Sequence, residues 1–237
     1  MQLNKVMITG TSRGLGYELV NRFYQAGVEV FAVVRDELSS ERLEKNFPYN
    51  VFPIVADISK DESESIISSS LMKKTDHLDI LINNAGVPGY EFQIQNVSTA
   101  EVADALNVHC LGVIRTVKAT LEFLNRSTNP VIVNVSSRLG SLQMTQNKQF
   151  QHLQTSYSYR IAKAAQNMLT LCLGQELNEK GISVHAIHPG KLKTEIAAAD
   201  ADTDVATGAE NIYQWLKNLD TVTPVEFIQP GVSKMLW

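Results

Sequence analysis

Residues 6–16 of the chain read VMITGTSRGLG. They begin with an apolar run, Val6 to Ile8, that is typical of a buried strand, and apolar residues then recur at helical spacing until Gly27. A second apolar run follows at residues 28–34. The order strand, glycine loop, helix, strand predicts a βαβ unit with the glycines at the amino end of its helix.

The three glycines of this loop have separate expected roles. Gly10 would permit a tight turn, Gly14 would let the backbone approach a pyrophosphate, and Gly16 would let the helix pack against the strand. An anion would then lie at the helix amino terminus. The spacing is G-x-x-x-G-x-G instead of the general G-x-G-x-x-G, so an ordinary glycine-rich turn stays open as an alternative at this point.

Apolar strands alternate with amphipathic stretches along the whole chain. We predict strands at residues 4–9, 28–34, 51–56, 78–83, 130–136, 182–187 and 225–228. With helices between them, this pattern predicts an α/β fold: one domain over residues 1–237, with a doubly wound parallel sheet of about seven strands and helices on both faces. Ligands of such sheets bind beyond the carboxyl ends of the strands.

Composition limits the classes of protein that fit. A chain of 237 residues that is 44% hydrophobic can form one α/β domain with a large core. A net charge of −4 gives no reason to expect nucleic acid or an anionic membrane as a partner. Neither a targeting segment nor an 18-residue apolar run is recognisable, so we expect a cytoplasmic protein. Cys110 and Cys172 are expected to be reduced core thiols, with a disulfide as the alternative.

A phenol and an ammonium lie four residues apart in the segment from Tyr159 to Lys163. On a helix they share a face, so the charge of Lys163 would favour ionised tyrosine and lower its pKa from the ordinary value of about 10. The phenol could then exchange protons usefully near neutral pH. Taken alone, a tyrosine and a lysine at this spacing would be interpreted as two ordinary side chains on an exposed helix face. Tyr157 is a weaker candidate, because the residue four positions later, Ile161, is uncharged.

Seven ordered motifs resemble those of the short-chain dehydrogenase/reductase family, and within it the chain is most similar to the small C-factor and sniffer-like carbonyl reductases. The motifs are Thr9 to Gly16, Asp57-Ile58, Asn83-Asn84-Ala85-Gly86, Asn107, Val133 to Ser137 with Gly140, Tyr159 to Lys163, and Pro189-Gly190 with Thr194. This resemblance covers nearly the whole chain. It implies a single-domain Rossmann fold and an oxidoreductase that interconverts a ketone or aldehyde and its alcohol by hydride transfer.

The resemblance implies four catalytic residues. Tyr159 would donate a proton to the carbonyl oxygen, Lys163 would lower its pKa and hold the nicotinamide ribose, and Ser137 would hydrogen-bond the oxygen. Asn107 would hold a water that links the lysine to bulk solvent, although it could instead bond to neighbouring backbone. Ser137 is favoured over Ser136 because adjacent side chains of a strand point to opposite sides.

The resemblance also implies a nicotinamide cofactor. The expected cofactor-binding residues are Gly10, Ser12, Arg13, Gly14, Leu15, Gly16, Arg35, Asp57, Ile58, Asn83, Ala85, Gly86, Tyr159, Lys163, Pro189, Gly190, Leu192 and Thr194. Alternatives stay open for several of them: Asp57 could cap a helix expected over Ser59 to Ser68, Asn83 could only stabilise the sheet edge, and Thr194 could cap the next helix.

Charge at the end of the second strand favours NADP(H) over NAD(H). Relatives that use NAD place an acid there for the ribose 2′-hydroxyl, whereas a 2′-phosphate requires cations. Here Arg35 follows an apolar residue at the expected acid position, and Arg13 lies within the glycine loop. Arginine binds phosphate through two parallel hydrogen bonds. The alternative is that both arginines are solvated and that Asp36 binds NAD.

The remaining expectations concern substrate, metal and partners. Loops near 141–156 and 194–210 would shape the substrate site, and since neither carries a cationic cluster we expect a small neutral carbonyl or alcohol. The histidines and cysteines lack metal-ligand spacing, so no metal is expected. Helices expected over 107–124 and 159–177 are apolar on more than one face, for example at Val113, Val117, Ile161 and Met168, which predicts a homodimer, with a tetramer as the alternative.

Two other functions stay open on the same resemblance. One is a C-factor-like signalling protein that binds NADP(H), and the other is a biosynthetic ketoreductase acting on a pathway intermediate. The presence of all four expected catalytic residues favours an enzyme over a protein that only binds the cofactor.

Overall fold

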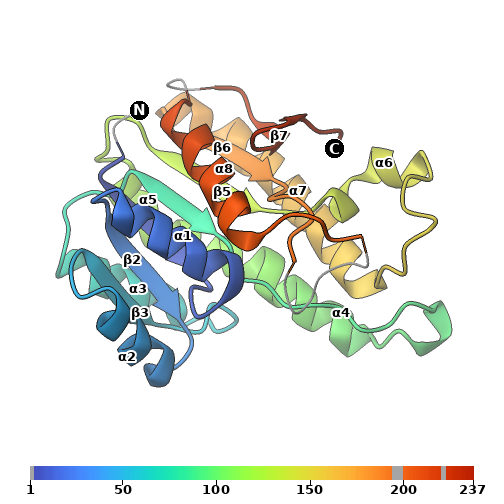
Figure 1. Ribbon diagram of the computed structural model, residues 1–237, viewed down its shortest axis with the longest axis horizontal. Coiled ribbons are helices and arrows are strands. Elements are labelled where there is room, and N and C mark those ends of the chain that lie inside the picture. Colours follow the sequence, from blue (N-terminus) through green and yellow to red (C-terminus); the bar gives the residue numbers. More distant parts are fainter. Residues whose placement is uncertain (1–2, 194–199, 220–222) are drawn as a thin grey trace.

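The computed structural model describes residues 3–193, 200–219 and 223–237. Its centre is one sheet of eight strands in the order β3-β2-β1-β4-β5-β6-β7-β8 (Figure 1). The strands are β1 (Lys5–Thr9), β2 (Glu29–Val34), β3 (Val51–Val55), β4 (Ile80–Asn83), β5 (Val131–Val135), β6 (Ser183–Ile187), β7 (Glu226–Gln229) and β8 (Ser233–Lys234). All pairings from β3 to β7 are parallel, and only β8 is antiparallel to its neighbour.

Helices cover both faces of the sheet (Figure 1). The core on one face includes side chains from α1 (Gly14–Gln25), α2 (Glu37–Asn46, with Leu43) and α8 (Val205–Lys217). The core on the other face includes side chains from α3 (Ser63–Met72), α5 (Gly112–Leu124) and α7 (Tyr157–Leu177). Shorter elements are α4 (Thr99–Leu106), α6 (Leu142–Gln146), the 3-10 turns η1 (Ile94–Asn96), η3 (Arg138–Gly140) and η4 (Asn178–Lys180), and the π-helix η2 (Asn107–Leu111).

The sequence pattern explains why one sheet has two cores. Neighbouring side chains of a strand point to opposite faces. In β1, Val6 and Ile8 therefore pack with α1 while Met7 packs in the other core, and all three are fully buried. A strand with helices on both faces is buried on both sides, which is why these strands consist mostly of consecutive apolar residues.

The predicted doubly wound α/β fold is confirmed, with each expected strand found within two residues of its predicted ends. Four details differ. The last strand, β8, was not predicted, because it has two exposed residues and no apolar pattern. The helix expected from Ser59 begins at Ser63, and the loop expected near 194–210 ends where α8 begins at Val205. Cys172 is exposed and so is not a core thiol.

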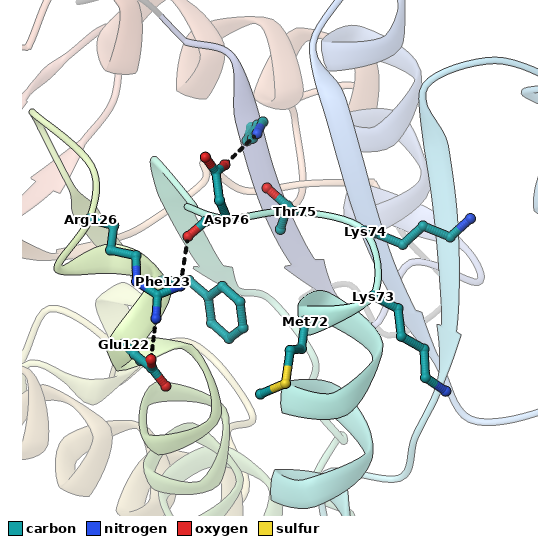
Figure 2. A pocket seen from close by; sticks show the side chains of 9 residues that line it. Met72, Lys73, Lys74, Thr75, Asp76, Glu122, Phe123 and Arg126 are labelled. Atoms are coloured by element: carbon teal, nitrogen blue, oxygen red, sulfur yellow. Dashed lines mark hydrogen bonds and ion pairs between the residues drawn. The ribbon is translucent and has the colours of Figure 1, made fainter.

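A pocket of about 690 Å³ lies at the amino end of β1, away from the sheet edge that carries the predicted motifs (Figure 2). Four of its charged groups are engaged within it: Lys5 bonds to Asp76, and Arg126 bonds to Glu122 and to the Asp76 carbonyl oxygen. The predicted motifs instead follow the carboxyl ends of β1, β4, β5 and β6. The chain turns in opposite directions from β1 and β4, which are neighbours, and this arrangement creates a ligand crevice in sheets of this kind.

Candidate active site

The glycine loop has the geometry that its sequence predicts. Gly10 has a φ of 69°, and a Cβ there would lie 2.7 Å from the Cα atom of Ala85. A Cβ on Gly16 would lie 2.2 Å from the Gly10 carbonyl oxygen, so the helix approaches the strand too closely for any side chain. Gly14, with a φ of 57°, faces open space.

The amino terminus of α1 is open to an anion. Its N-cap, Arg13, makes no side-chain capping bond, so no cap from that residue covers the N–H groups of the first turn. Together with the free space at Gly14, this arrangement fits a pyrophosphate. Ser12 is half-buried in the loop. Leu15 and Ile58 are buried in the two cores, so only their backbone atoms are free to contact a cofactor.

The loop after β4 is fixed to the glycine loop. Asn84 donates from Nδ2 to the carbonyl oxygens of Thr9 and Gly10, at 2.9 and 3.1 Å. The backbone N–H of Ala85 donates to Thr9 Oγ1 at 3.0 Å. The two loops expected to contact the cofactor therefore form one unit.

Asn83 serves the interior of the sheet. Its Nδ2 donates to Asn134 Oδ1 at 2.9 Å, and its Oδ1 accepts from Thr116 Oγ1 at 2.6 Å. All three side chains are at most 3% exposed. The side chain of Asn83 therefore stabilises the sheet, as the alternative holds. The backbone of Ala85 and the exposed Gly86 are the parts of this loop that could contact a cofactor.

The end of β2 carries the residues on which the two cofactor alternatives depend. Asp36 is engaged as the N-cap of α2, because its carboxylate accepts from Ser39 N at 2.8 Å and from Ser39 Oγ at 3.1 Å. The backbone hydrogen bond from Ser39 holds the pKa of Asp36 below its usual value. Arg35 is exposed beside it. Asp57 accepts from Ser59 N at 3.0 Å in a turn, and although burial acts to raise its pKa, the Ser59 hydrogen bonds and the charge of Arg35 lower it overall.

Ser137, Tyr159 and Lys163 come together beyond the carboxyl end of β5. Ser137 is buried, and its side chain hydrogen-bonds that of Tyr159. Lys163 lies one turn further along α7, 3% exposed, with its Nζ 5.7 Å from the centroid of the Tyr159 ring. Ser136 turns away, since its Oγ donates to Asn167 Oδ1 at 2.5 Å.

Burial controls the protonation of both catalytic groups. It raises the pKa of Tyr159 above its ordinary value, with the Ser137 hydrogen bond acting in the opposite direction. The lowering expected from the sequence is therefore absent in this structure, and at neutral pH the phenol carries the proton that a carbonyl oxygen would receive. Burial also lowers the pKa of Lys163 to about 7. Its ammonium donates to the Val135 carbonyl oxygen at 2.6 Å and to Gln166 Oε1 at 3.0 Å.

The structure does not bring the side chain of Asn107 to this group. Its Nδ2 donates to the Ser59 carbonyl oxygen at 3.0 Å, and its Oδ1 accepts from Arg115 at 2.9 Å. Asn107 is the first residue of the π-helix Asn107–Leu111, an irregular turn that contains one residue more than an α-helical turn. Its side chain is thus engaged elsewhere, and the role of holding a water remains a prediction for this residue.

His109 occupies the place beside Tyr159. The two rings meet edge to face, with centroids 5.5 Å apart, and a side chain on Gly86 would collide with the imidazole. His109 Nε2 lies 2.9 Å from the Val87 carbonyl oxygen. Burial and the charge of Lys163 lower the pKa of His109 to about 3, so the ring is neutral. The sequence did not predict this contact, because a 3.6-residue period does not reveal the π-turn that contains His109.

The segment after β6 is joined to the residue that follows Ser137. Gly190 has a φ of 99° and follows Pro189, and Leu192 pairs with Thr203 in an isolated bridge. Thr194 lies outside the described residues. Arg138, directly after Ser137, is bound by both carboxylate oxygens of Asp200, at 2.7 and 2.6 Å. The nearest cation to Ser137 in sequence is therefore neutralised.

No group of three or more His, Cys, Asp or Glu side chains could hold a metal ion in the described part of the chain. Over the same residues, no helix is long and apolar enough to cross a membrane.

Known proteins are similar to this chain in sequence and in fold. Residues 4–204 match the family model described as short chain dehydrogenase. L-fucose dehydrogenase of Mus musculus is 28% identical over 201 residues, which is 83% of this chain and 70% of that protein. The structures of an NADPH-bound carbonyl reductase from chicken fatty liver and of the carbonyl reductase Sniffer of D. melanogaster match over the full length of both chains, each at 26% identity, with TM-scores of 0.88 and 0.85.

Proposed function

The chain belongs to the short-chain dehydrogenase family of oxidoreductases, which act on alcohol and carbonyl groups, and we propose that it is an NADPH-dependent carbonyl reductase. In this proposal it interconverts a ketone or aldehyde with its alcohol. The observation that carries the proposal is the meeting of Ser137, Tyr159 and Lys163 next to an open glycine loop.

The cofactor, when bound, supplies the hydride, and the residues of the chain supply the rest. Tyr159, protonated by virtue of its burial, donates its proton to the carbonyl oxygen. Ser137 hydrogen-bonds that oxygen as negative charge develops on it. The buried ammonium of Lys163 stabilises the phenolate that remains.

The preference for NADP(H) rests on the charges at the end of β2. Asp36 is already used as a helix cap, whereas Arg35 is exposed next to it and Arg13 lies in the neighbouring glycine loop. Two arginines there would bind the charged 2′-phosphate of NADP(H) much more strongly than the uncharged 2′-hydroxyl of NAD(H). The NADPH bound to the carbonyl reductase from chicken fatty liver, a protein of the same fold, agrees with this choice.

A neutral carbonyl compound is the proposed class of substrate. Three cations of the segments after β5 and β6 have carboxylate partners: Arg138 pairs with Asp200, Lys191 with Asp202, and Lys193 with Asp204 at 3.3 Å. An anionic substrate would have to compete with these acids for each cation.

The test is to assay a panel of ketones, aldehydes and quinones by the loss of NADPH absorbance, in parallel with Tyr159→Phe. We expect turnover that needs the phenol. A protein that binds NADPH tightly and reduces none of these compounds would favour the signalling alternative.

A further inference from the structure

Gln166 lies fully buried beneath Lys163, and nothing in the proposed reaction uses it. It follows Lys163 by three residues on α7, so the two side chains share one face of the helix. Its Oε1 accepts a hydrogen bond from Lys163 Nζ at 3.0 Å. The exposed fraction of Gln166 is 0%.

The other end of the amide is unpartnered. Gln166 Nε2 is buried and has no hydrogen-bond partner among the described residues. A buried donor without a partner is unfavourable, and leucine or methionine would fill a similar volume without one. Rotating the amide would place its NH2 group against the ammonium, two donors facing each other. Stability alone would therefore favour an apolar residue here.

Gln166 also limits the directions in which Lys163 can donate. An ammonium has three N–H groups. One is taken by the Val135 carbonyl oxygen at 2.6 Å and one by Gln166 Oε1, which leaves one for the side that Tyr159 occupies.

We propose that Gln166 is a positioning residue that keeps Lys163 charged and directs its remaining N–H toward Tyr159 and the cofactor. Only the consequence for turnover rests on the proposed function. The hydrogen bond from Lys163 to Gln166 does not depend on which reaction the protein catalyses.

No anionic side chain of the described residues faces Lys163, so the role of holding its ammonium falls to Gln166. The titratable groups of the described residues that face it are Tyr159 from its own helix and His109 from η2. Neither is an anion at neutral pH, because burial raises the pKa of Tyr159 and lowers that of His109. From β5 and η3 come Val135 and Gly140, which carry no charge. An uncharged oxygen is therefore the side-chain acceptor that holds the ammonium.

The direct test is the protonation of Lys163 in the full-length protein. The ε-carbon signals of isotopically labelled lysine are followed against pH by NMR, with Lys163→Met used only to assign the signal. Gln166→Leu and Gln166→Met should lower the midpoint by about 1 pH unit, a tenfold change in the protonation constant, because the charged form loses an acceptor. Gln166→Glu should raise it, because a carboxylate favours the ammonium more strongly.

Thr170→Val is the matched control. Thr170 is equally buried one turn further along α7, and its hydroxyl donates to the Gln166 carbonyl oxygen at 2.7 Å without touching Lys163. Its loss should lower thermal stability and leave the Lys163 midpoint in place. If the apolar variants fail to fold, Gln166→Glu alone decides, since it must raise the midpoint.

Turnover provides the second measurement. The alkaline limb of the kcat profile with NADPH should move in the same direction as the Lys163 midpoint in each folded variant. Unchanged midpoints in folded Gln166→Met and Gln166→Glu would overturn the proposal. Shifted midpoints in a protein that reduces no carbonyl compound would support the role of Gln166 and contradict the proposed function.

Discussion

The imidazole of His109 meets the phenol of Tyr159 edge to face, with ring centroids 5.5 Å apart and planes at 89°. The same imidazole bonds to Val87, in the loop that follows β4. The proton donor of the proposed reaction and a loop expected to contact the cofactor are thus joined through one neutral ring.

We expect His109→Ala to lower kcat by about 10- to 100-fold, because Tyr159 loses the ring that fixes its orientation and small misplacements are costly in catalysis. His109→Phe keeps the ring contact and loses the bond to Val87, so its kcat should lie between that of the wild-type protein and that of His109→Ala. Steady-state kinetics with a carbonyl substrate and NADPH measure both. Equal kcat values in the three proteins would show that His109 only fills space.

Tyr159→Phe should abolish carbonyl reduction and leave NADPH affinity nearly unchanged, because only the transferable proton is removed. Cofactor affinity is measured by NADPH fluorescence and turnover by absorbance. Tyr157→Phe is the control, since that side chain is 40% exposed two residues earlier on α7. Full turnover in Tyr159→Phe, or equal losses in the two variants, would refute the assignment.

Arg35→Ala should weaken NADPH binding by about 1.5–3 kcal/mol, the value of a hydrogen bond to a charged group, and should change NADH binding little. Titration of both cofactors against the variant measures the difference. Lys45→Ala removes an exposed charge from the last turn of α2, at the far end of that helix from Arg35, and should affect neither. Equal weakening of NADPH and NADH by Arg35→Ala would contradict the assignment to NADP(H).

The sequence was sufficient for the fold because its signals are local. Buried parallel strands are rich in consecutive apolar residues, such as Val30 to Val34 in β2, and the glycine loop needs Gly10 and Gly16 where no Cβ fits. The positions of Tyr159 and Lys163 were predictable for the same reason, since regular helical spacing places them on one face.

The remainder depended on contacts between distant segments. The π-turn that contains Asn107 and His109 has no signature in the periodicity of the sequence. The pKa of Tyr159 moved opposite to the expectation, because burial is set by the packing of the whole site and not by the residue four positions away. The acceptor role of Gln166 appears only once Lys163 is seen to be buried.

Stability should fall as the pH is lowered from 6.5 toward 4.5. Burial lowers the pKa of His109 to about 3 and those of His185 and His188 to about 4. In the unfolded chain each histidine titrates near 6.5, so in this window the unfolded state binds more protons and the free energy of unfolding decreases. Each residue contributes up to about 1.4 kcal/mol per pH unit.

Urea unfolding at several pH values measures this slope. His185→Phe keeps a ring against Trp215. It should reduce the dependence of the free energy of unfolding on pH by the contribution of one histidine, whatever its effect on stability at pH 7. A free energy of unfolding that is constant between pH 6.5 and 4.5 would show that these rings are protonated or exposed in the folded protein.

A homodimer remains our prediction, but only part of the set of side chains first considered lies at the surface. Val113 and Val117 are 2% and 5% exposed and belong to the core of the chain itself. The apolar surface instead consists of Leu111 and Ile114, 46% and 37% exposed, with Ile161 and Met168, 44% and 58% exposed, on η2, α5 and α7. These elements lie on the same face of the sheet, and a surface of this kind marks a protein interface.

Met168→Glu places a charge on that surface and should convert the dimer into a monomer of 26.3 kDa, as measured by light scattering at micromolar concentration. Met72→Glu is the control, because Met72 is 67% exposed at the end of α3 and should leave the assembly unchanged. Met168→Glu should retain NADPH binding, since its side chain points away from the buried face that carries Lys163. A wild-type protein that is already monomeric would refute the dimer and leave the catalytic assignment intact, because every group assigned to the reaction comes from one chain.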